Sequence, residues 1–375
     1  MSNARLIFDS PERNADLYYA TRFTAPDDIL FLERQGKRYL ILSDLEYERG
    51  RKEAKGVRIF SLAEWQEKAK RARQEPNSIG VIATLLTAFK IKKITVPRST
   101  AFYLVDGLRK KSFKVESGTH PFCPERIFKT PQEKKWMVEA QRMTFRSFRV
   151  AEDILRQSKI RRGLLYWKGK VLTSERVRFE MEKFLLAQNF QPVFSAIVAG
   201  GRQACDPHCI GSGPLRPHQA IIIDCFPRSA RTRFYGDATR TFCKGKAPPE
   251  LKKQYAAVQF AQEMAIAKIK AGINGKTIHR AIQKHFERSG FPTKKIGGKK
   301  QGFIHGTGHG IGLEIHEEPT RISGVNFKLK KGHVVTVEPG LYYYKTGGVR
   351  LEDLVYVTGR GCEVLANYPK RLEIP

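Results

Sequence analysis

The stretch from Gly302 to His316 places the tightest constraint on the fold of this 375-residue chain. It reads Gly-Phe-Ile-His-Gly-Thr-Gly-His-Gly-Ile-Gly-Leu-Glu-Ile-His, so that three of the chain's nine histidines lie within twelve residues. The intervening glycines disfavour a helix and let a ligand approach the backbone closely. A helical His-Glu-x-x-His zinc site is excluded, because Gly306 stands where that motif needs glutamate. The stretch therefore predicts a histidine-bearing site, with a glycine-rich loop of solvated histidines as the alternative.

Acidic residues end or flank apolar runs on both sides of this stretch. Two strand-like runs end on a carboxylate, Asp224 in one and Glu338 in the other, and Asp237 and Glu352 lie in similarly apolar surroundings. Each of them, taken alone, could also be a turn or cap residue. Arg350 precedes Glu352 by two positions, so on a strand the two side chains point the same way and the guanidinium could orient the carboxylate.

Four carboxylates and one imidazole form a mainly hard-oxygen ligand set that suits a pair of divalent ions such as Mn²⁺, Co²⁺, Fe²⁺ or Zn²⁺. Their negative charges would offset two dications. Two ions about 3.5–4 Å apart lower the pKa of bound water and polarise a carbonyl group. This part of the sequence therefore predicts hydrolytic chemistry.

Composition fits a globular chain long enough for two domains, with 41% hydrophobic and 10% aromatic residues. No apolar run approaches the roughly 20 residues of a membrane span, and the first ten residues lack a signal-peptide pattern, so a cytoplasmic location is expected. The six cysteines include no Cys-x-x-Cys pair, which makes a disulfide framework improbable. The formal charge is 68 − 37 = +31. Such a charge attracts polyanions, but the basic residues are scattered, so a generally basic surface is favoured over a nucleic-acid site.

The apolar patterns predict an α/β unit followed by a larger one. In the first unit we expect strands at 28–33, 38–43 and 93–97 and helices at 63–73 and 79–90. In the second we expect helices at 130–157, 173–188, 251–270 and 277–289, a loop at 161–170, and strands that include 193–198 and 349–357. Thr130-Pro131-Gln132-Glu133 combines three helix-start signals. A boundary is expected near residue 124.

Five residues with their flanking motifs occur in an order that resembles the pita-bread metallopeptidases. They are Asp224, Asp237 in Gly-Asp-Ala-Thr-Arg-Thr-Phe, His309 in His-Gly-Thr-Gly-His, Glu338 in Val-Glu-Pro-Gly and Glu352 in Val-Arg-Leu-Glu-Asp. The family includes Xaa-Pro aminopeptidases, prolidases, methionine aminopeptidases and the metal-free creatinases. The resemblance covers about residues 125–365, and residues 1–120 more weakly resemble the creatinase-type N-terminal domain.

The resemblance implies an α/β (α+β) fold with two domains. Residues 1–124 would form a small creatinase-like α/β domain. Residues 125–375 would form a pita-bread catalytic domain, with a curved antiparallel sheet flanked by helices.

The resemblance also implies a role for each site residue. The metal ligands would be Asp224, Asp237, His309, Glu338 and Glu352, holding two divalent ions, with Mn²⁺ expected and Co²⁺, Zn²⁺ or Fe²⁺ as alternatives. Glu338 would also shuttle protons, and His316 would stabilise the tetrahedral intermediate. His208 would lie on the substrate side of the site and would also be a catalytic residue. His305 would line the proline-facing pocket. Arg350 would support the ligands and complete the substrate-binding set.

The implied activity is hydrolysis of the bond before proline in Xaa-Pro peptides or dipeptides, by a hydroxide that bridges the metals, in a homodimer. Aminopeptidase and dipeptidase both remain open. A metal-free hydrolase is opposed by the complete ligand set, and an inactive binding protein for nucleic acid or protein is the remaining alternative. Asp224 and Asp237 are 13 residues apart, where the family has eleven, so an insertion is expected between Arg228 and Arg233. Cys205 and Cys209 flank His208 and put substrate specificity in doubt.

Overall fold

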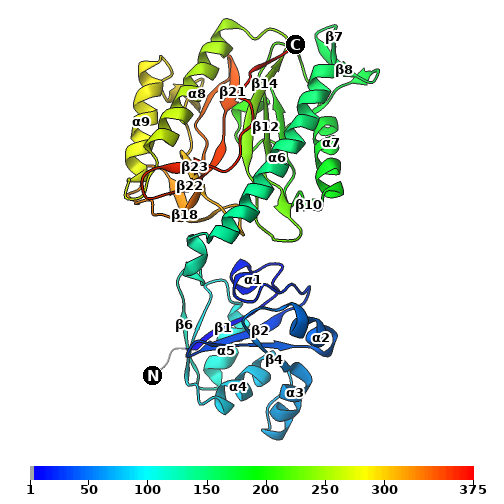
Figure 1. Ribbon diagram of the computed structural model, residues 1–375, viewed down its shortest axis with the longest axis vertical. Coiled ribbons are helices and arrows are strands. Elements are labelled where there is room, and N and C mark those ends of the chain that lie inside the picture. Colours follow the sequence, from blue (N-terminus) through cyan, green and yellow to red (C-terminus); the bar gives the residue numbers. More distant parts are fainter. Residues whose placement is uncertain (1–3) are drawn as a thin grey trace. The chain divides into compact units, whose positions relative to one another are not determined.

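The computed structural model describes residues 4–375. The chain divides into two compact units, one that ends at Arg126 and one that runs from Ile127 to Pro375 (Figure 1). The sequence suggested a division between residues 124 and 125. Each unit has its own hydrophobic cores. Among the described residues, none of the helices is both long enough and apolar enough to cross a membrane.

The first unit is built on a mixed six-stranded sheet with the order β4-β3-β2-β1-β5-β6. Its strands are β1 (Ala4–Asp9), β2 (Ile29–Arg34), β3 (Lys37–Leu42), β4 (Arg58–Ser61), β5 (Lys93–Val96) and β6 (Lys114–Ser117). Its helices are α1 (Ala15–Thr21), α2 (Asp44–Glu53), α3 (Leu62–Arg71), α4 (Ser78–Ala88) and α5 (Phe102–Lys110). The expected strands at 28–33 and 38–43 form a hairpin, because Gln35 and Gly36, with φ of 51° and 72°, form a two-residue turn that follows the twist of the strands. The predicted α/β class is therefore correct for this unit.

A short 3-10 turn, Pro124–Ile127, spans the boundary between the units, and the first helix of the second unit is the 27-residue α6 (Pro131–Gln157). Thr130 caps α6, and its hydroxyl and the Glu133 carboxylate form the reciprocal capping box that the sequence predicted. The other helices are α7 (Ser174–Ala187), α8 (Pro249–Lys268) and α9 (Gly275–Arg288).

Two sheets form the middle of the second unit, between the helix pairs (Figure 1). One has the order β11-β12-β14-β24, from β11 (Ile197–Gly200), β12 (Ile221–Cys225), β14 (Ala238–Lys244) and β24 (Glu373–Ile374). The other has the order β18-β17-β19-β22-β23, from β17 (Gly308–Gly310), β18 (Glu317–Ile322), β19 (Val334–Val337), β22 (Asp353–Val357) and β23 (Cys362–Val364). All but one of their pairings are antiparallel.

The helices divide between two cores. Helices α6 and α7 pack on β11, β12 and β14 through buried side chains such as Phe148, Met181 and Ile223. Helices α8 and α9 pack on β19 and β22 through residues such as Val258 and Ile282. Strands β12, β14 and β19 are therefore buried along their whole length. Polar side chains on these strands are therefore shielded from bulk water.

Three sequence predictions fail in detail. The expected loop at 161–170 is a three-stranded sheet of β7 (Lys159–Arg161), β8 (Leu164–Trp167) and β9 (Lys170–Val171). Its turns contain Gly163 and Gly169, both at positive φ, which are the hairpin signals that the basic composition obscured. The strand expected at 193–198 begins only at Ile197. The single strand expected at 349–357 is broken, because Glu352 leaves β21 (Gly347–Arg350) to form a bridge with Thr239.

The expected insertion is a small closed loop. Strand β13 (Arg228–Ser229) pairs with β10 (Phe190–Gln191), and Arg233, at φ 63°, donates its backbone N–H to the Ser229 carbonyl at 2.8 Å. Gly236 N–H then donates to the Pro227 carbonyl at 3.0 Å. The loop closes at Gly236, and β14 begins at Ala238, one residue after Asp237.

Candidate metal centre

Adjacent antiparallel strands carry the first two acids. On β12, Asp224 lies opposite Thr239 of β14, and Asp237 immediately precedes β14. Gln141 of α6 fixes Asp237 from the other side: its amide nitrogen donates to the Asp237 carbonyl and its amide oxygen accepts from the Asp237 N–H, both at 2.8 Å. The register of Asp237 is thus set by Gln141, whatever the length of the preceding loop.

The imidazole of His309 comes from the short strand β17. Its backbone N–H donates to the Thr336 hydroxyl at 3.0 Å, and its Nδ1 lies 3.1 Å from the Gly310 carbonyl. A carbonyl oxygen only accepts, so Nδ1 carries the proton and Nε2 keeps its lone pair. Nε2 points at two acids, 3.8 Å from Asp237 Oδ2 and 3.7 Å from Glu338 Oε1. Burial, with the nearby His316, lowers the pKa of His309 to about 3, so the ring is neutral near pH 7 and suited to a metal.

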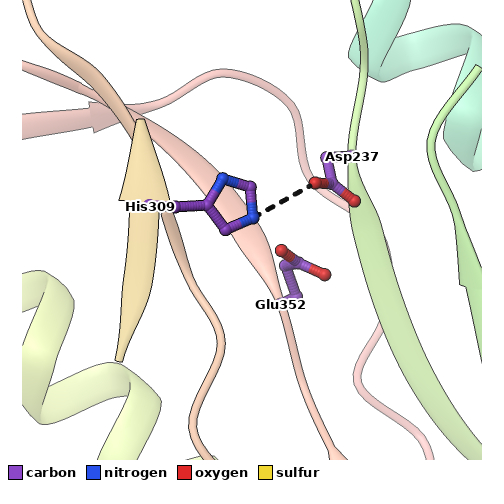
Figure 2. A group of neighbouring side chains, drawn as sticks. All are labelled: Asp237, His309 and Glu352. Carbon is purple, nitrogen blue, oxygen red and sulfur yellow. Dashed lines mark ion pairs between the residues drawn. The ribbon is translucent and has the colours of Figure 1, made fainter. Parts of the chain in front are cut away.

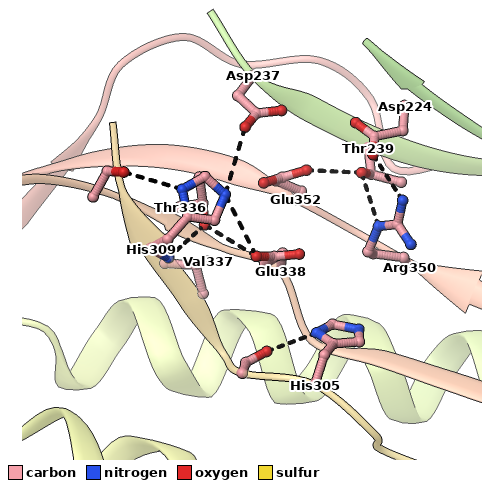
Figure 3. Close-up of polar contacts among 12 residues, drawn as sticks. Asp224, Asp237, Thr239, His305, His309, Thr336, Val337, Glu338, Arg350 and Glu352 are labelled. Carbon is pink, nitrogen blue, oxygen red and sulfur yellow. Dashed lines mark hydrogen bonds and ion pairs between the residues drawn. The ribbon is translucent and has the colours of Figure 1, made fainter. Parts of the chain in front are cut away.

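Asp237, His309 and Glu352 can each offer one ligand atom such that the three atoms lie within 4.8 Å of one another (Figure 2). Glu352 reaches this position because its backbone N–H donates to the Thr239 carbonyl at 3.0 Å and its Oε2 accepts from the Thr239 hydroxyl at 2.7 Å. Glu338 follows β19 directly and lies beside His309 (Figure 3). Four of the five residues predicted as ligands thus face one another.

Asp224, the fifth, is held by Arg350. One guanidinium nitrogen, Nη2, donates to Asp224 Oδ2 at 2.7 Å, while Nε donates to the Thr239 hydroxyl at 3.1 Å (Figure 3). The second carboxylate oxygen, Oδ1, is buried and has no hydrogen-bond partner among the described residues. A buried oxygen of this kind is costly unless something binds it.

The electrostatics of the cluster call for cations. Burial, together with the other carboxylates, raises the pKa of Asp237 and Glu352 well above the ordinary values. Burial also raises the pKa of Asp224, against the opposing effect of Arg350, and raises that of Glu338 to about 7. Four acids so placed cannot all ionise without positive charge between them. The donor set therefore fits two divalent ions, and the orphaned oxygen of Asp224 is one place where such an ion would be bound.

The remaining predicted residues lie around this cluster. The His316 ring meets the His309 ring edge-on, with centroids 4.3 Å apart. His305 lies beside the centre with Nδ1 donating to the Gly306 carbonyl at 2.8 Å and Nε2 accepting from the Tyr342 hydroxyl at 2.7 Å. His208 is exposed, but its charge lowers the pKa of His316 after the larger effect of burial. It therefore lies on the open side of the site.

Four supporting residues escaped the sequence analysis: Gln141, Thr239, Thr336 and Tyr342. Thr239 and Thr336 lie two positions from Asp237 and Glu338, so alternation along a strand could have placed them on the ligand-bearing faces. The Thr336 hydroxyl links two predicted ligands of one sheet, since it accepts from the His309 N–H and donates to Glu338 at 3.4 Å. The contacts of Gln141 and Tyr342 depend on the tertiary fold, and nothing local marks them.

Comparison with known proteins gives a consistent result. The model of metallopeptidase family M24 matches residues 135–359. The uncharacterised peptidase YqhT of Bacillus subtilis is 31% identical over 250 residues, which cover 66% of this chain and 65% of that protein. The Xaa-Pro dipeptidase of Pyrococcus furiosus is 32% identical over 183 residues, or 48% of this chain and 50% of that protein. The matches thus span about half to two-thirds of these curated relatives.

Solved structures resemble the chain over nearly its whole length. An X-Pro aminopeptidase from Thermotoga maritima has a TM-score of 0.81 at 24% identity and covers 99% of this chain and 97% of its own. A Xaa-Pro dipeptidase from Bacillus anthracis has a TM-score of 0.82 at 25% identity, with 100% of this chain and 95% of its own covered. The predicted pita-bread fold is confirmed by these matches.

Proposed function

This chain belongs to metallopeptidase family M24, and on that basis we propose that it hydrolyses the peptide bond before a proline in Xaa-Pro peptides or dipeptides. The observation that carries the proposal is the buried group of Asp237, His309 and Glu352, with Glu338 3.7 Å from the imidazole. Relatives and solved structures named Xaa-Pro dipeptidase and X-Pro aminopeptidase support the choice of substrate.

Five side chains would hold two divalent ions, for which Mn²⁺ is our expectation: Asp224, Asp237, His309, Glu338 and Glu352. When bound, the ions would lower the pKa of water and polarise the scissile carbonyl. Two features of the chain favour metal binding, because His309 keeps Nε2 free of a proton and Arg350 opposes the rise in the pKa of Asp224.

Glu338 is the side chain that we assign to proton transfer. Its carboxylate is buried, accepts from the Thr336 hydroxyl at 3.4 Å, and has a pKa raised to about 7 in the absence of metal. A carboxylate held at the end of a strand can take a proton from water and return it to the leaving amine without moving its backbone. Its backbone is fixed because the Glu338 N–H donates to the Thr307 carbonyl at 2.8 Å.

The histidines are assigned to the substrate. His316, against His309, would hydrogen-bond the oxygen that gains negative charge during attack, and His208 would bind the substrate from the open side. His305 would border the proline ring, with its orientation fixed by Tyr342, whose hydroxyl also accepts from Arg350 Nη1 at 3.0 Å. Arg350 thus contacts both Asp224, a predicted metal ligand, and Tyr342, which orients His305 in the proposed substrate pocket.

The proposal is tested with purified, manganese-loaded protein and three peptides: Ala-Pro, Ala-Pro-Pro and Ala-Ala-Ala. We expect cleavage of at least one proline peptide and none of Ala-Ala-Ala. The first two separate a dipeptidase from an aminopeptidase. Glu338→Gln should abolish turnover while metal analysis still finds at least one bound ion, and full activity in that variant would remove Glu338 from its role.

Failure on both proline peptides, together with tight and salt-sensitive RNA binding, would favour the inactive binding protein instead. We expect a cytoplasmic homodimer, and sedimentation of the loaded protein tests the dimer.

A further inference from the structure

A buried ion pair outside the metal centre joins the segment before α6 to the loop that carries His316. Lys129 and Glu317 have side chains only 1% and 2% exposed, and Lys129 Nζ donates to Glu317 Oε1. The lysine is fixed at its backbone too, because its N–H donates to the Gly332 carbonyl at 2.8 Å. Nζ lies 3.4 Å from the Ile127 carbonyl as well. Lys129 is therefore a rigid anchor point.

Glu317 in turn shapes the loop that precedes it. Its second oxygen, Oε2, accepts from the Leu313 N–H at 3.2 Å. A Cβ on Gly312 would lie 2.3 Å from Oε1, so the backbone of the loop turns directly against the carboxylate. Glu317 also pairs with Gly310 at the start of β18. Glu317 thus holds the segment from Gly310 to Glu317 at two points, through its backbone pairing with Gly310 and through its carboxylate at Leu313.

The position of His316 follows from that anchoring. His316 lies in the bend that leads into β18, directly before Glu317, so the fixed position of Glu317 restricts where the His316 ring can lie. Glu317 points into the interior toward Lys129, whereas its neighbour His316 is exposed and meets the His309 ring at an interplanar angle of 88°. Burial of Glu317 therefore directs His316 to the face of the metal centre.

Stability alone does not explain an ion pair at this place. The free energy lost when two charges leave water is about as large as the free energy gained from their attraction. Well-packed apolar side chains would therefore stabilise the fold equally well. What an apolar pair would lack is the directed contact with the Leu313 N–H. The ion pair therefore fixes the geometry of the loop and adds little to the free energy of folding.

We propose that the Lys129–Glu317 pair positions His316 for the reaction, with neither residue touching the substrate. The inference rests on the role assigned to His316 above. It assigns a function in the reaction to Lys129, which lies 187 positions away in the sequence. The pair acts on the rate of the chemical step, and metal binding does not depend on it.

The test replaces both charges together, as Lys129→Met with Glu317→Leu, because a single replacement would leave one charge buried and unpaired. We expect kcat to fall about ten- to a hundredfold, as for supports that orient a reacting group. KM for the cleaved peptide and metal content should stay close to those of the unmodified protein, and the melting temperature should fall by only a few degrees, because the Leu313 N–H loses its acceptor. The matched control is Lys134→Met, which removes a partly exposed lysine paired with Glu363 and should leave kcat unchanged.

A double-mutant cycle with His316→Ala separates positioning from general damage. If the pair acts through His316, its replacement lowers kcat in the unmodified protein but by less than about twofold in the His316→Ala background. An equal loss in both backgrounds, or no loss in either, would overturn the proposal. Should the double replacement fail to fold, Lys129→Arg keeps the charge and changes the geometry, and the same cycle applies to it.

A measurement without catalysis keeps this inference distinct from the proposed function. In metal-free protein labelled with ¹⁵N-histidine, the ring resonances of His316 should shift on double replacement, while those of His218 stay in place. Wild-type protein that cleaves no peptide would refute the proposed function only. Unchanged His316 resonances would refute the positioning.

Discussion

Metal-free protein should lose stability as pH rises, because its buried acids hold protons that the unfolded chain releases. Burial, and secondarily the nearby Asp224, raises the pKa of Glu338 from 4.5 to about 7, while Arg350 opposes the shift. The folded chain therefore binds more protons than the unfolded chain between these values. The resulting stability is fully present below about pH 4.5 and is lost as pH rises through about 7.

The magnitude follows from the two pKa values of Glu338. A rise from 4.5 to about 7 corresponds to roughly 3 kcal/mol of stability in total. Integration between about pH 5 and about pH 8 gives a loss of roughly 2–3 kcal/mol. The pKa values of Asp224, Asp237 and Glu352 shift in the same direction, so the loss for the whole protein exceeds this figure.

The assay compares protein that keeps Glu338 with Glu338→Gln, both stripped with a chelator and both carrying Trp65→Phe. In that background the remaining tryptophans, Trp136 and Trp167, report only on the unit from Ile127 to Pro375. Urea unfolding at several pH values gives the free energy of unfolding of each protein. Their difference should change by roughly 2–3 kcal/mol between about pH 5 and about pH 8, in favour of the variant at high pH.

A difference that stays flat within about 0.5 kcal/mol over this range would refute the reasoning, because Glu338 would then titrate as an ordinary exposed acid. Saturating Mn²⁺ provides the control. Metal competes with protons for the same oxygens and binds only the folded chain, so stability should then rise with pH.

Three further substitutions test the supports of the centre. Thr239→Val removes the hydroxyl bonded to Glu352 with little change of shape, and metal affinity by competition titration should fall about ten- to a hundredfold. Arg240→Met removes a fully buried guanidinium that donates to the Glu352 carbonyl at 2.7 Å and pairs with Asp353. Because the buried Asp353 carboxylate is then poorly compensated, the free energy of unfolding measured in urea should fall by about 3–5 kcal/mol. Gly308→Ala would put a Cβ 1.9 Å from a backbone oxygen, and its cost should be at least about 2 kcal/mol.

Each of these predictions has an outcome that contradicts it. Unchanged metal affinity in Thr239→Val would mean that its hydroxyl does not orient the ligand. A stability loss below about 1 kcal/mol in Arg240→Met would mean that water reaches the buried acid. For the glycine, Gly324→Ala is the matched control, since nothing lies within 4 Å of its added Cβ. Equal effects at Gly308 and Gly324 would rule out the steric argument.

Local sequence was enough to predict features that local contacts decide. The start of α6 is set by Thr130 and Glu133, three residues apart, and both capping bonds are present. The strands at Asp224 and Glu338 could be predicted because each is a continuous apolar run that stops at an acidic residue. Of the predicted ligands, Asp237, His309, Glu338 and Glu352 face one another, and Asp224 is held by Arg350.

Other features depend on contacts that the sequence does not record. Gln141 reaches Asp237 across 96 positions, and Thr239 reaches Glu352 across 113. The break at Glu352 was missed because its bridge to Thr239 competes with continuation of the strand, and no turn residue marks it. Lys129 resembles any basic residue until the fold buries it.

The crowding of four acids around the centre also limits how a chain of this kind could lose its metals over time. Without cations, Asp237 and Glu352 are held against each other and against Asp224 and Glu338 in an interior with few compensating donors. Loss of one ligand would leave the others in that state. An evolutionary descendant that no longer bound the ions would therefore be stabilised by replacing several of these acids with neutral side chains. The number of such replacements would indicate how long ago metal binding was lost.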